Sequence, residues 1–200
     1  MKMIGLVGGI GSGKSTVARL IGRNERVVVI DADQLGHEVL RQDEVKTLIK
    51  EQWGDAPFGN DGEICRRKMA ELVFSNTENG NKNLVLLNQI SHPRITELLN
   101  KRLDNARMNE VRMAVIDAPL LLESGWGHLC DGMIFVDSPL SARIARVLER
   151  GWTSEEFQVR TANQLPLDTK RKAAQCVIEN DCSLVELEQR VVAVMQQILD

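Results

Sequence analysis

The chain has 200 residues, of which 43% are hydrophobic and 26% charged, and a formal net charge of −3. These values are those of an ordinary soluble globular protein of about one domain, and the small negative charge excludes the basic surface of a general nucleic-acid or membrane binder. No apolar run reaches the ~18 residues that a membrane span needs. The first residues lead directly into an expected strand, so we expect no signal peptide and a cytoplasmic protein.

Short apolar runs alternate with helical patterns along the chain, which is typical of parallel strands covered by helices on both faces. The runs are rich in Val, Ile or Met, and most end beside Asp or Gly. We expect strands at residues 3–7, 27–30, 113–116 and 133–136, with a weaker one at 176–178. The pattern therefore predicts an α/β fold with a parallel sheet.

A glycine-rich loop follows the first expected strand. Residues 8–15 read G-G-I-G-S-G-K-S, which fits the phosphate-loop pattern G-x-x-x-x-G-K-S without a mismatch. Glycines let backbone N–H groups point at phosphate oxygens, and the helix that follows adds its N-terminal dipole. The loop predicts ATP as co-substrate with Mg²⁺, bound through Gly9, Gly11, Ser12, Gly13, Lys14, Ser15 and Thr16. Lys14 would neutralise the β- and γ-phosphates, and the Ser15 hydroxyl would ligate the metal.

Carboxylates follow the next two expected strands. Asp31 and Asp33 come after the second strand and Asp117 ends the third, and ligands gather at the carboxyl ends of parallel strands. We expect Asp117 to hold Mg²⁺ directly or through water, and Asp33 to accept a proton from an acceptor hydroxyl. For any one of these residues taken alone, a helix cap or turn carboxylate is the competing interpretation.

Two long intervals between strands predict insertions in a single P-loop kinase domain. The core covers about 1–54, 110–142 and 173–200, and a helical acceptor-binding subdomain covers about 55–109, opened by a turn-rich stretch at 54–62. The second insertion, about 143–172, is rich in Arg and Lys. Arg146 and Arg150 share a helix face. We interpret this insertion as a lid that brings arginine to the transferred phosphoryl group, against the alternative of a solvated charged face.

The C-terminal third carries several helix signals. Ser138 is expected to cap a helix that has Pro139 at its first position. Thr153 with Glu156 and Ser183 with Glu186 have the spacing of capping boxes. An apolar stripe at helical spacing predicts core packing; it consists of Leu187, Val191, Val194, Met195 and Ile198.

These residues resemble the dephospho-CoA kinase family nearly end to end. Besides the loop, the resemblance is carried by Asp31-Ala32-Asp33, Asp61-Gly62 with Arg66 and Leu72-Val73-Phe74, His92-Pro93, residues 117–123 (D-A-P-L-L-L-E), Arg146 with Arg150, Gln164-Leu165-Pro166 with Lys170, and Ile178-Glu179-Asn180. His92-Pro93 resembles a pair that opens a helix in that family. Two residues of the expected lid depart from the pattern: Arg143 stands where Gln is usual, and Gly151 where Asp is more frequent.

The resemblance implies ATP-dependent phosphorylation of the ribose 3′-hydroxyl of dephospho-CoA, the last step of CoA biosynthesis. It implies Asp33, Lys14 and Arg150 as catalytic residues, Arg146 and Asn180 as nucleotide contacts, and Asp33, Arg66, His92 and Leu120 as acceptor contacts. We expect small-molecule partners only and a monomer or small homo-oligomer. A nucleoside or nucleotide monophosphate kinase is the nearest alternative, and a non-catalytic nucleotide switch is a more distant one.

Overall fold

The computed structural model describes residues 1–73 and 78–199 and divides the chain into two compact units. The first unit comprises Met1–Asp31 and Leu103–Asp200, and the second comprises Ala32–Arg102. In the described part of the chain, no helix is both long and apolar enough to cross a bilayer. Phe74, part of the stretch compared with the family, lies outside the described residues.

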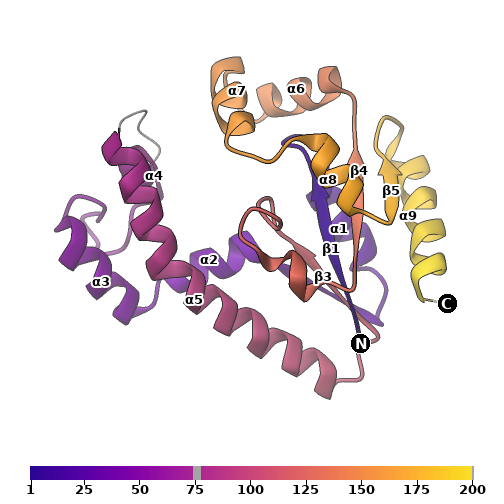
Figure 1. The fold of residues 1–200 in the computed structure, drawn as a ribbon, viewed down its shortest axis with the longest axis horizontal. Coiled ribbons are helices and arrows are strands. Elements are labelled where there is room, and N and C mark those ends of the chain that lie inside the picture. Colours follow the sequence, from indigo (N-terminus) through magenta and orange to yellow (C-terminus); the bar gives the residue numbers. More distant parts are fainter. Residues whose placement is uncertain (74–77, 200) are drawn as a thin grey trace. The chain divides into compact units, whose positions relative to one another are not determined.

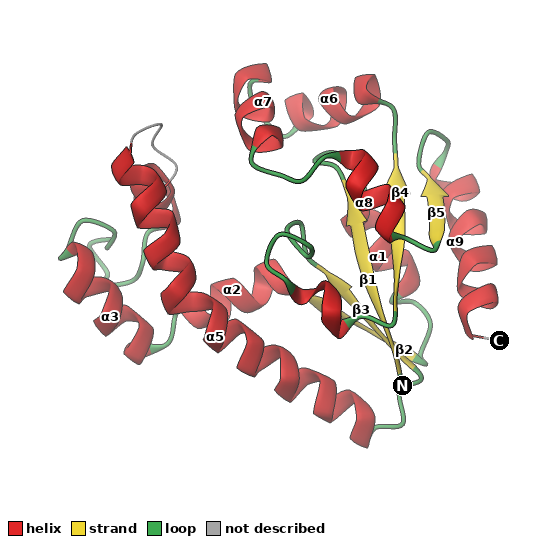
Figure 2. Cartoon of the chain, in the orientation of Figure 1, coloured by secondary structure: helices red, strands yellow, loops and turns green. Residues whose placement is uncertain are grey.

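Five strands of the first unit form one parallel sheet in the order β2-β3-β1-β4-β5 (Figure 2). Their bounds are β1 Lys2–Gly8, β2 Val27–Asp31, β3 Met113–Asp117, β4 Gly132–Asp137 and β5 Cys176–Glu179. Each contains the run from which it was predicted, so the expected α/β fold is confirmed. The chain crosses from β3 over the central β1 to β4, which places the end of β1 where the strand order reverses.

Both faces of the sheet are covered. Alternate strand residues such as Leu6, Val115 and Val136 pack with α1 (Lys14–Ile21) and α9 (Leu184–Leu199), which bury one face (Figure 1). The predicted apolar stripe of α9 lies in this core. On the other face, a Cβ at Gly5 would lie 2.4 Å from Leu121 Cδ2, so glycine leaves room for the segment after β3.

The remaining elements of the first unit follow β3 and β4. They are the 3₁₀ helix η1 (Trp126–Leu129), α6 (Leu140–Glu149), α7 (Ser154–Ala162) and α8 (Leu167–Ala173). The capping boxes of Thr153 and Ser183 are confirmed by reciprocal bonds with Glu156 and Glu186. The expected cap at Ser138 is wrong: Pro139 is the N-cap of α6, and Ser138 Oγ instead donates to Asn180 O at 2.9 Å.

The second unit is helical. It contains α2 (Ala32–Leu40), α3 (Asp43–Trp53), α4 (Arg66–Val73) and most of α5 (Glu78–Met108). The predicted turn-rich stretch forms a tight turn closed by a bridge between Phe58 and Ile64. Asn83 ties three segments together, because its Oδ1 accepts from Trp53 Nε1 at 3.0 Å and its Nδ2 donates to Leu72 O at 3.1 Å.

His92 and Pro93 do not open a helix, which corrects the expectation drawn from the resemblance. They lie in the middle of α5, where Pro93 provides no N–H for the carbonyl of Gln89. Gln89 is exposed, so water can reach that carbonyl. The helix continues because its other main-chain bonds form, and Arg94 Nη1 adds a bond to Ile90 O at 3.0 Å.

Candidate active site

The glycine loop connects the central strand β1 to α1, as the sequence predicted. Gly11 and Gly13 have φ angles of 76° and 91°, a region that disfavours side chains, and Gly13 is the N-cap of α1. The loop folds on itself through Ser12 N to Gly9 O at 3.1 Å and Thr16 N to Gly13 O at 3.0 Å. The backbone therefore curves tightly ahead of a helix N-terminus, the arrangement that binds phosphate.

Lys14 begins α1 and is buried, with its Nζ donating to Gly8 O at 3.3 Å. This bond draws the ammonium back over the loop. Ser15, next in the helix, is exposed, and Thr16 is half-buried. Ser12 is 1% exposed, and its Oγ has no hydrogen-bond partner among the described residues. The loop region thus contains a buried lysine and a buried hydroxyl, both of residue types that bind anions.

Arg146 and Asn180 hold the loop from the side. Asn180 Nδ2 donates to Ser12 O at 2.7 Å, and Arg146 Nη1 donates to Gly11 O at 3.1 Å and Ser12 O at 3.3 Å. Arg146 also donates to Ser138 Oγ and Asn180 O, each at 2.9 Å. Both residues were predicted as nucleotide contacts, and both lie on the phosphate loop. The same bonds explain why Ser138 does not cap α6.

Asp117 stands beside the loop at the carboxyl edge of the sheet. In the strand register it lies opposite Leu6 of β1 on one side and Asp31 of β2 on the other, and its side chain is buried. Carboxylate and hydroxyl oxygens are the ligands that Mg²⁺ prefers. Ser15 is the second residue of α1, the helix that follows β1, so Asp117 and Ser15 are of the residue types that can hold a magnesium ion.

The segment after β3 is fixed by a buried ion pair that sequence reasoning did not single out as part of the site. Lys170 of α8 is 1% exposed, and its Nζ lies 2.8 Å from Glu123 Oε1. Lys170 also donates to Pro119 O at 3.3 Å, and Leu165 N donates to Glu123 Oε1 at 2.9 Å. Leu120, predicted as an acceptor contact, is 47% exposed on this segment.

Burial alone would raise the pKa of Glu123, but hydrogen bonds from Lys170 and Leu165 outweigh it and the pKa falls below its usual value. The carboxylate is therefore ionised at neutral pH. Both partners stand in the motifs that carry the family resemblance, at 117–123 and at 164–170. The two motifs are more than forty positions apart along the chain, and nothing in the sequence indicated that they are in contact.

Arg143 and Arg150 lie on α6 in different surroundings. Arg143 is 4% exposed and its Nε donates to Ile10 O at 2.8 Å, so it packs on the phosphate loop. Arg150, predicted as catalytic, is the exposed C-cap of α6. Arg143 was recognised in the sequence as a basic departure from the family pattern but was left out of the predicted site. Its position three residues before Arg146 was the available signal.

Three of the predicted acceptor contacts belong to the second unit. Asp33 is exposed in the first turn of α2, Arg66 is exposed at the start of α4, and His92 is half-buried in α5. Within this unit α2 and α5 pack together, since Arg102 Nη2 donates to Glu38 at 3.0 Å and 3.1 Å. Burial lowers the pKa of His92, which favours the neutral imidazole.

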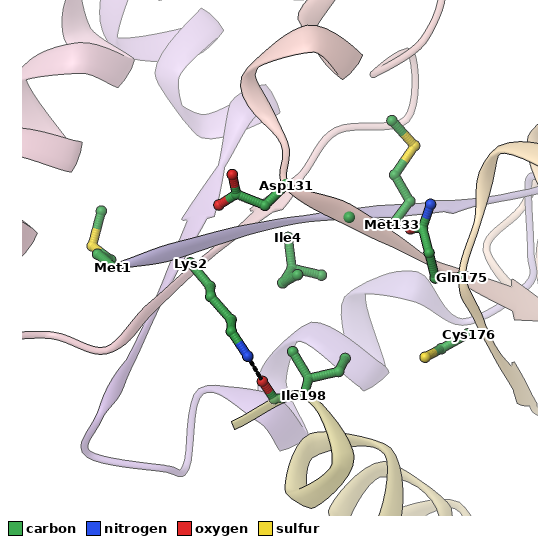
Figure 3. A pocket seen from close by; sticks show the side chains of 9 residues that line it. Met1, Lys2, Ile4, Asp131, Met133, Gln175, Cys176 and Ile198 are labelled. Carbon is green, nitrogen blue, oxygen red and sulfur yellow. Dashed lines mark hydrogen bonds between the residues drawn. The ribbon is translucent and has the colours of Figure 1, made fainter. Parts of the chain in front are cut away.

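A hollow of about 550 Å³ lies at the opposite edge of the sheet (Figure 3). It is lined at the amino ends of β1, β4 and β5 by residues such as Lys2, Met133 and Cys176, and Lys2 Nζ donates across it to Ile198 O at 2.5 Å. Ligands of parallel sheets gather at the carboxyl ends of the strands instead. We therefore assign this hollow no part in phosphoryl transfer.

A central strand that runs into a phosphate loop, with an acidic residue at the end of the neighbouring strand, defines a P-loop phosphotransferase of the kinase type. The family model for dephospho-CoA kinase matches residues 2–186. The chain belongs to the dephospho-CoA kinase family. The enzyme class and fold predicted from the sequence are thereby confirmed.

Individual relatives are similar to this chain over nearly the full length of both proteins. The dephospho-CoA kinase of Dehalococcoides mccartyi is 35% identical over 94% of this chain and 93% of its own length. That of Bacillus licheniformis is 38% identical over 99% and 95%. A Thermus thermophilus protein of known crystal structure is 35% identical, with a TM-score of 0.82 over 98% of this chain and 97% of that one.

Proposed function

We propose that the protein transfers the γ-phosphoryl group of ATP to the 3′-hydroxyl of the ribose of dephospho-CoA, giving CoA and ADP. This would be the final step of CoA biosynthesis. The observation that carries the proposal is the phosphate loop, held by Arg146 and Asn180 in a chain whose full-length relatives bear this enzyme's name. The reaction forms a bond from the 3′-oxygen to the γ-phosphorus and breaks the bond from that phosphorus to the β–γ bridging oxygen.

The loop would bind the nucleotide. Backbone N–H groups from Gly9 to Thr16 would surround the phosphates, and Lys14 would neutralise their charge. Arg146 and Asn180 already have most of their polar groups engaged with the loop and with each other. In the proposed complex they keep the loop in shape and border the nucleotide beside it.

Magnesium would be held by Ser15 and Asp117, directly or through water. When bound, the ion would neutralise negative charge that develops on the phosphates during transfer. The protein's own part is to fix these oxygens at one edge of the sheet. The strand register does this for Asp117, and the helix start does it for Ser15.

Asp33 would orient the acceptor hydroxyl and take its proton as the new bond forms. It lies two residues beyond the end of β2 along the chain, in the first turn of α2. Arg66 and His92 of the second unit and Leu120 of the first would bind the acceptor. The lid, about 143–172, would bring Arg150 to the transferred phosphoryl group. Arg150 is exposed at the end of α6, so its guanidinium is available for this contact.

In this proposal the insertion at about 55–109 binds the acceptor, and the core at about 1–54, 110–142 and 173–200 binds ATP. We also place the enzyme in the cytoplasm as a monomer or small homo-oligomer that binds small molecules. All four cysteines are free thiols, which suits a reducing compartment.

The deciding experiment is a coupled assay of ADP release with dephospho-CoA, nucleosides and nucleoside monophosphates compared as acceptors. We expect turnover with dephospho-CoA, and the product should carry a phosphate on the 3′-oxygen. Turnover of a nucleotide without turnover of dephospho-CoA would replace the proposal by a nucleotide kinase. ATP hydrolysis that no acceptor stimulates would favour a nucleotide switch.

A further inference from the structure

The side chain of Arg143 lies directly on the phosphate loop. Its Nε donates to Ile10 O at 2.8 Å, and its Cζ lies 2.5 Å from the position that a Cβ on Gly9 would take. The ring of Phe157 in α7 has its centroid 5.5 Å from the same Cζ. The guanidinium is therefore fixed against the loop backbone at Gly9 and Ile10, with an aromatic ring of the lid within cation–π range.

One end of this guanidinium lacks a partner. Arg143 Nη2 is buried and has no hydrogen-bond partner among the described residues, and the same is true of Ser12 Oγ on the loop. A buried polar group left without a partner is costly, and a cation more so. Burial lowers the pKa of Arg143, with Asp137 opposing the shift, yet an arginine stays protonated at neutral pH. A dehydrated positive charge thus sits at the start of an anion-binding loop.

Arg146 differs from Arg143 in the donors that remain. Both N–H groups of Arg146 Nη1 are already used by Gly11 O, Ser12 O and Ser138 Oγ. Arg143 uses its Nε on Ile10 O and has Nη2 left over. Arg146 Nη2 donates to Asn180 O, whereas the buried Arg143 Nη2 has no hydrogen-bond partner among the described residues.

We propose that Arg143 is a phosphate-binding residue of this enzyme, whose Nη2 donates to a non-bridging oxygen of the ATP triphosphate. The inference rests on the proposed use of ATP. Lys14 contributes a charge from the helix side of the loop, and Arg143 contributes a second one from the lid side.

The test compares Arg143→Gln and Arg143→Lys with the wild-type chain. Dissociation constants for ATP, inorganic tripolyphosphate and AMP are measured by calorimetry without any acceptor, and melting temperatures establish that each variant is folded. Arg19→Gln, which removes an exposed arginine from α1, is the matched control. We expect Arg143→Gln to raise the dissociation constants of ATP and tripolyphosphate about ten- to a hundredfold, which is the range expected for the loss of a charge-assisted hydrogen bond. Arg143→Lys should recover part of the lost affinity, and Arg19→Gln should bind both ligands as tightly as the wild-type chain.

AMP separates phosphate binding from a structural role. Its affinity should change less than twofold in Arg143→Gln, because it lacks the terminal phosphates. Equal losses for AMP and ATP would show that Arg143 only shapes the loop and would overturn the proposal, as would unchanged ATP affinity. These binding constants are measured without an acceptor, so they test the role of Arg143 even if the protein does not phosphorylate dephospho-CoA. A wild-type chain without affinity for ATP or tripolyphosphate would overturn both proposals.

Discussion

Asp33 is the residue on which the proposed chemistry depends most. Asp33→Asn keeps the size of the side chain but cannot accept the hydroxyl proton, so we expect kcat to fall about 10²- to 10⁴-fold. ATP affinity should stay unchanged, because the phosphate loop is intact. Steady-state kinetics and ATP titration measure the two effects. Asp43→Asn removes another exposed carboxylate of the same unit and serves as the control. An unaffected kcat in Asp33→Asn would remove Asp33 as the base.

Cys130 provides a pH-dependent prediction. Burial, with a smaller contribution from Asp131, raises the pKa of its thiol from 9.0 to about 11. Between these values the unfolded chain loses the proton while the folded chain keeps it, so the free energy of unfolding should fall as pH rises from 9 to 11. Chemical denaturation of the wild-type chain and Cys130→Ala at several pH values measures this. The fall should be smaller in the variant, and identical slopes would contradict the shifted pKa.

Gly151 explains the end of α6 at the scale of the element. Its φ is 83°, its N–H donates to Leu148 O at 2.9 Å, and Trp152 N donates to Val147 O at 3.1 Å. These two bonds form a Schellman motif, in which glycine is the favoured residue. The departure from the family pattern at this position therefore has a local reason: glycine adopts the left-handed conformation that stops the helix directly after Arg150.

Replacing Gly151 should destabilise the protein only through backbone strain and not through a steric clash, since no heavy atom of the described residues lies within 4 Å of the Cβ position. We expect Gly151→Ala to lower the free energy of unfolding by about 1 kcal/mol. Gly151→Asn should lose less, because Asn tolerates positive φ. Urea denaturation ranks the three proteins. Equal stability of all three would show that the helix end relaxes out of the left-handed conformation.

At the scale of the molecule, the buried pair of Lys170 and Glu123 joins α8 to the segment after β3. We expect Lys170→Met to lower the free energy of unfolding by about 3–5 kcal/mol, because it leaves the Glu123 carboxylate without its cation. The double variant Lys170→Met with Glu123→Gln should regain most of the loss. Urea denaturation of the two single variants and the double variant completes a mutant cycle. Strictly additive losses would mean that the two side chains do not stabilise each other.

The sequence was sufficient for the sheet and for the phosphate loop. Short continuous apolar runs between helical patterns suit strands covered on both faces, and G-x-x-x-x-G-K-S is typical of a phosphate loop between a strand and a helix. Local signals also predicted the capping boxes of α7 and α9, because a cap involves residues only three apart. Local reasoning failed at Ser138, whose hydroxyl donates to the distant Asn180 O instead of capping a helix. The expectation drawn from the resemblance failed at His92-Pro93, which lies inside a continuing helix.

The sequence by itself determined the phosphate-loop motif at residues 8–16 and predicted a kinase, since that motif is contiguous along the chain. Only the tertiary structure decided which distant side chains support the loop. Arg143, Arg146 and Asn180 reach it from more than 130 positions away along the chain, and Lys170 meets Glu123 from another helix. Such contacts depend on strand order and helix packing, which spacing along the sequence does not encode.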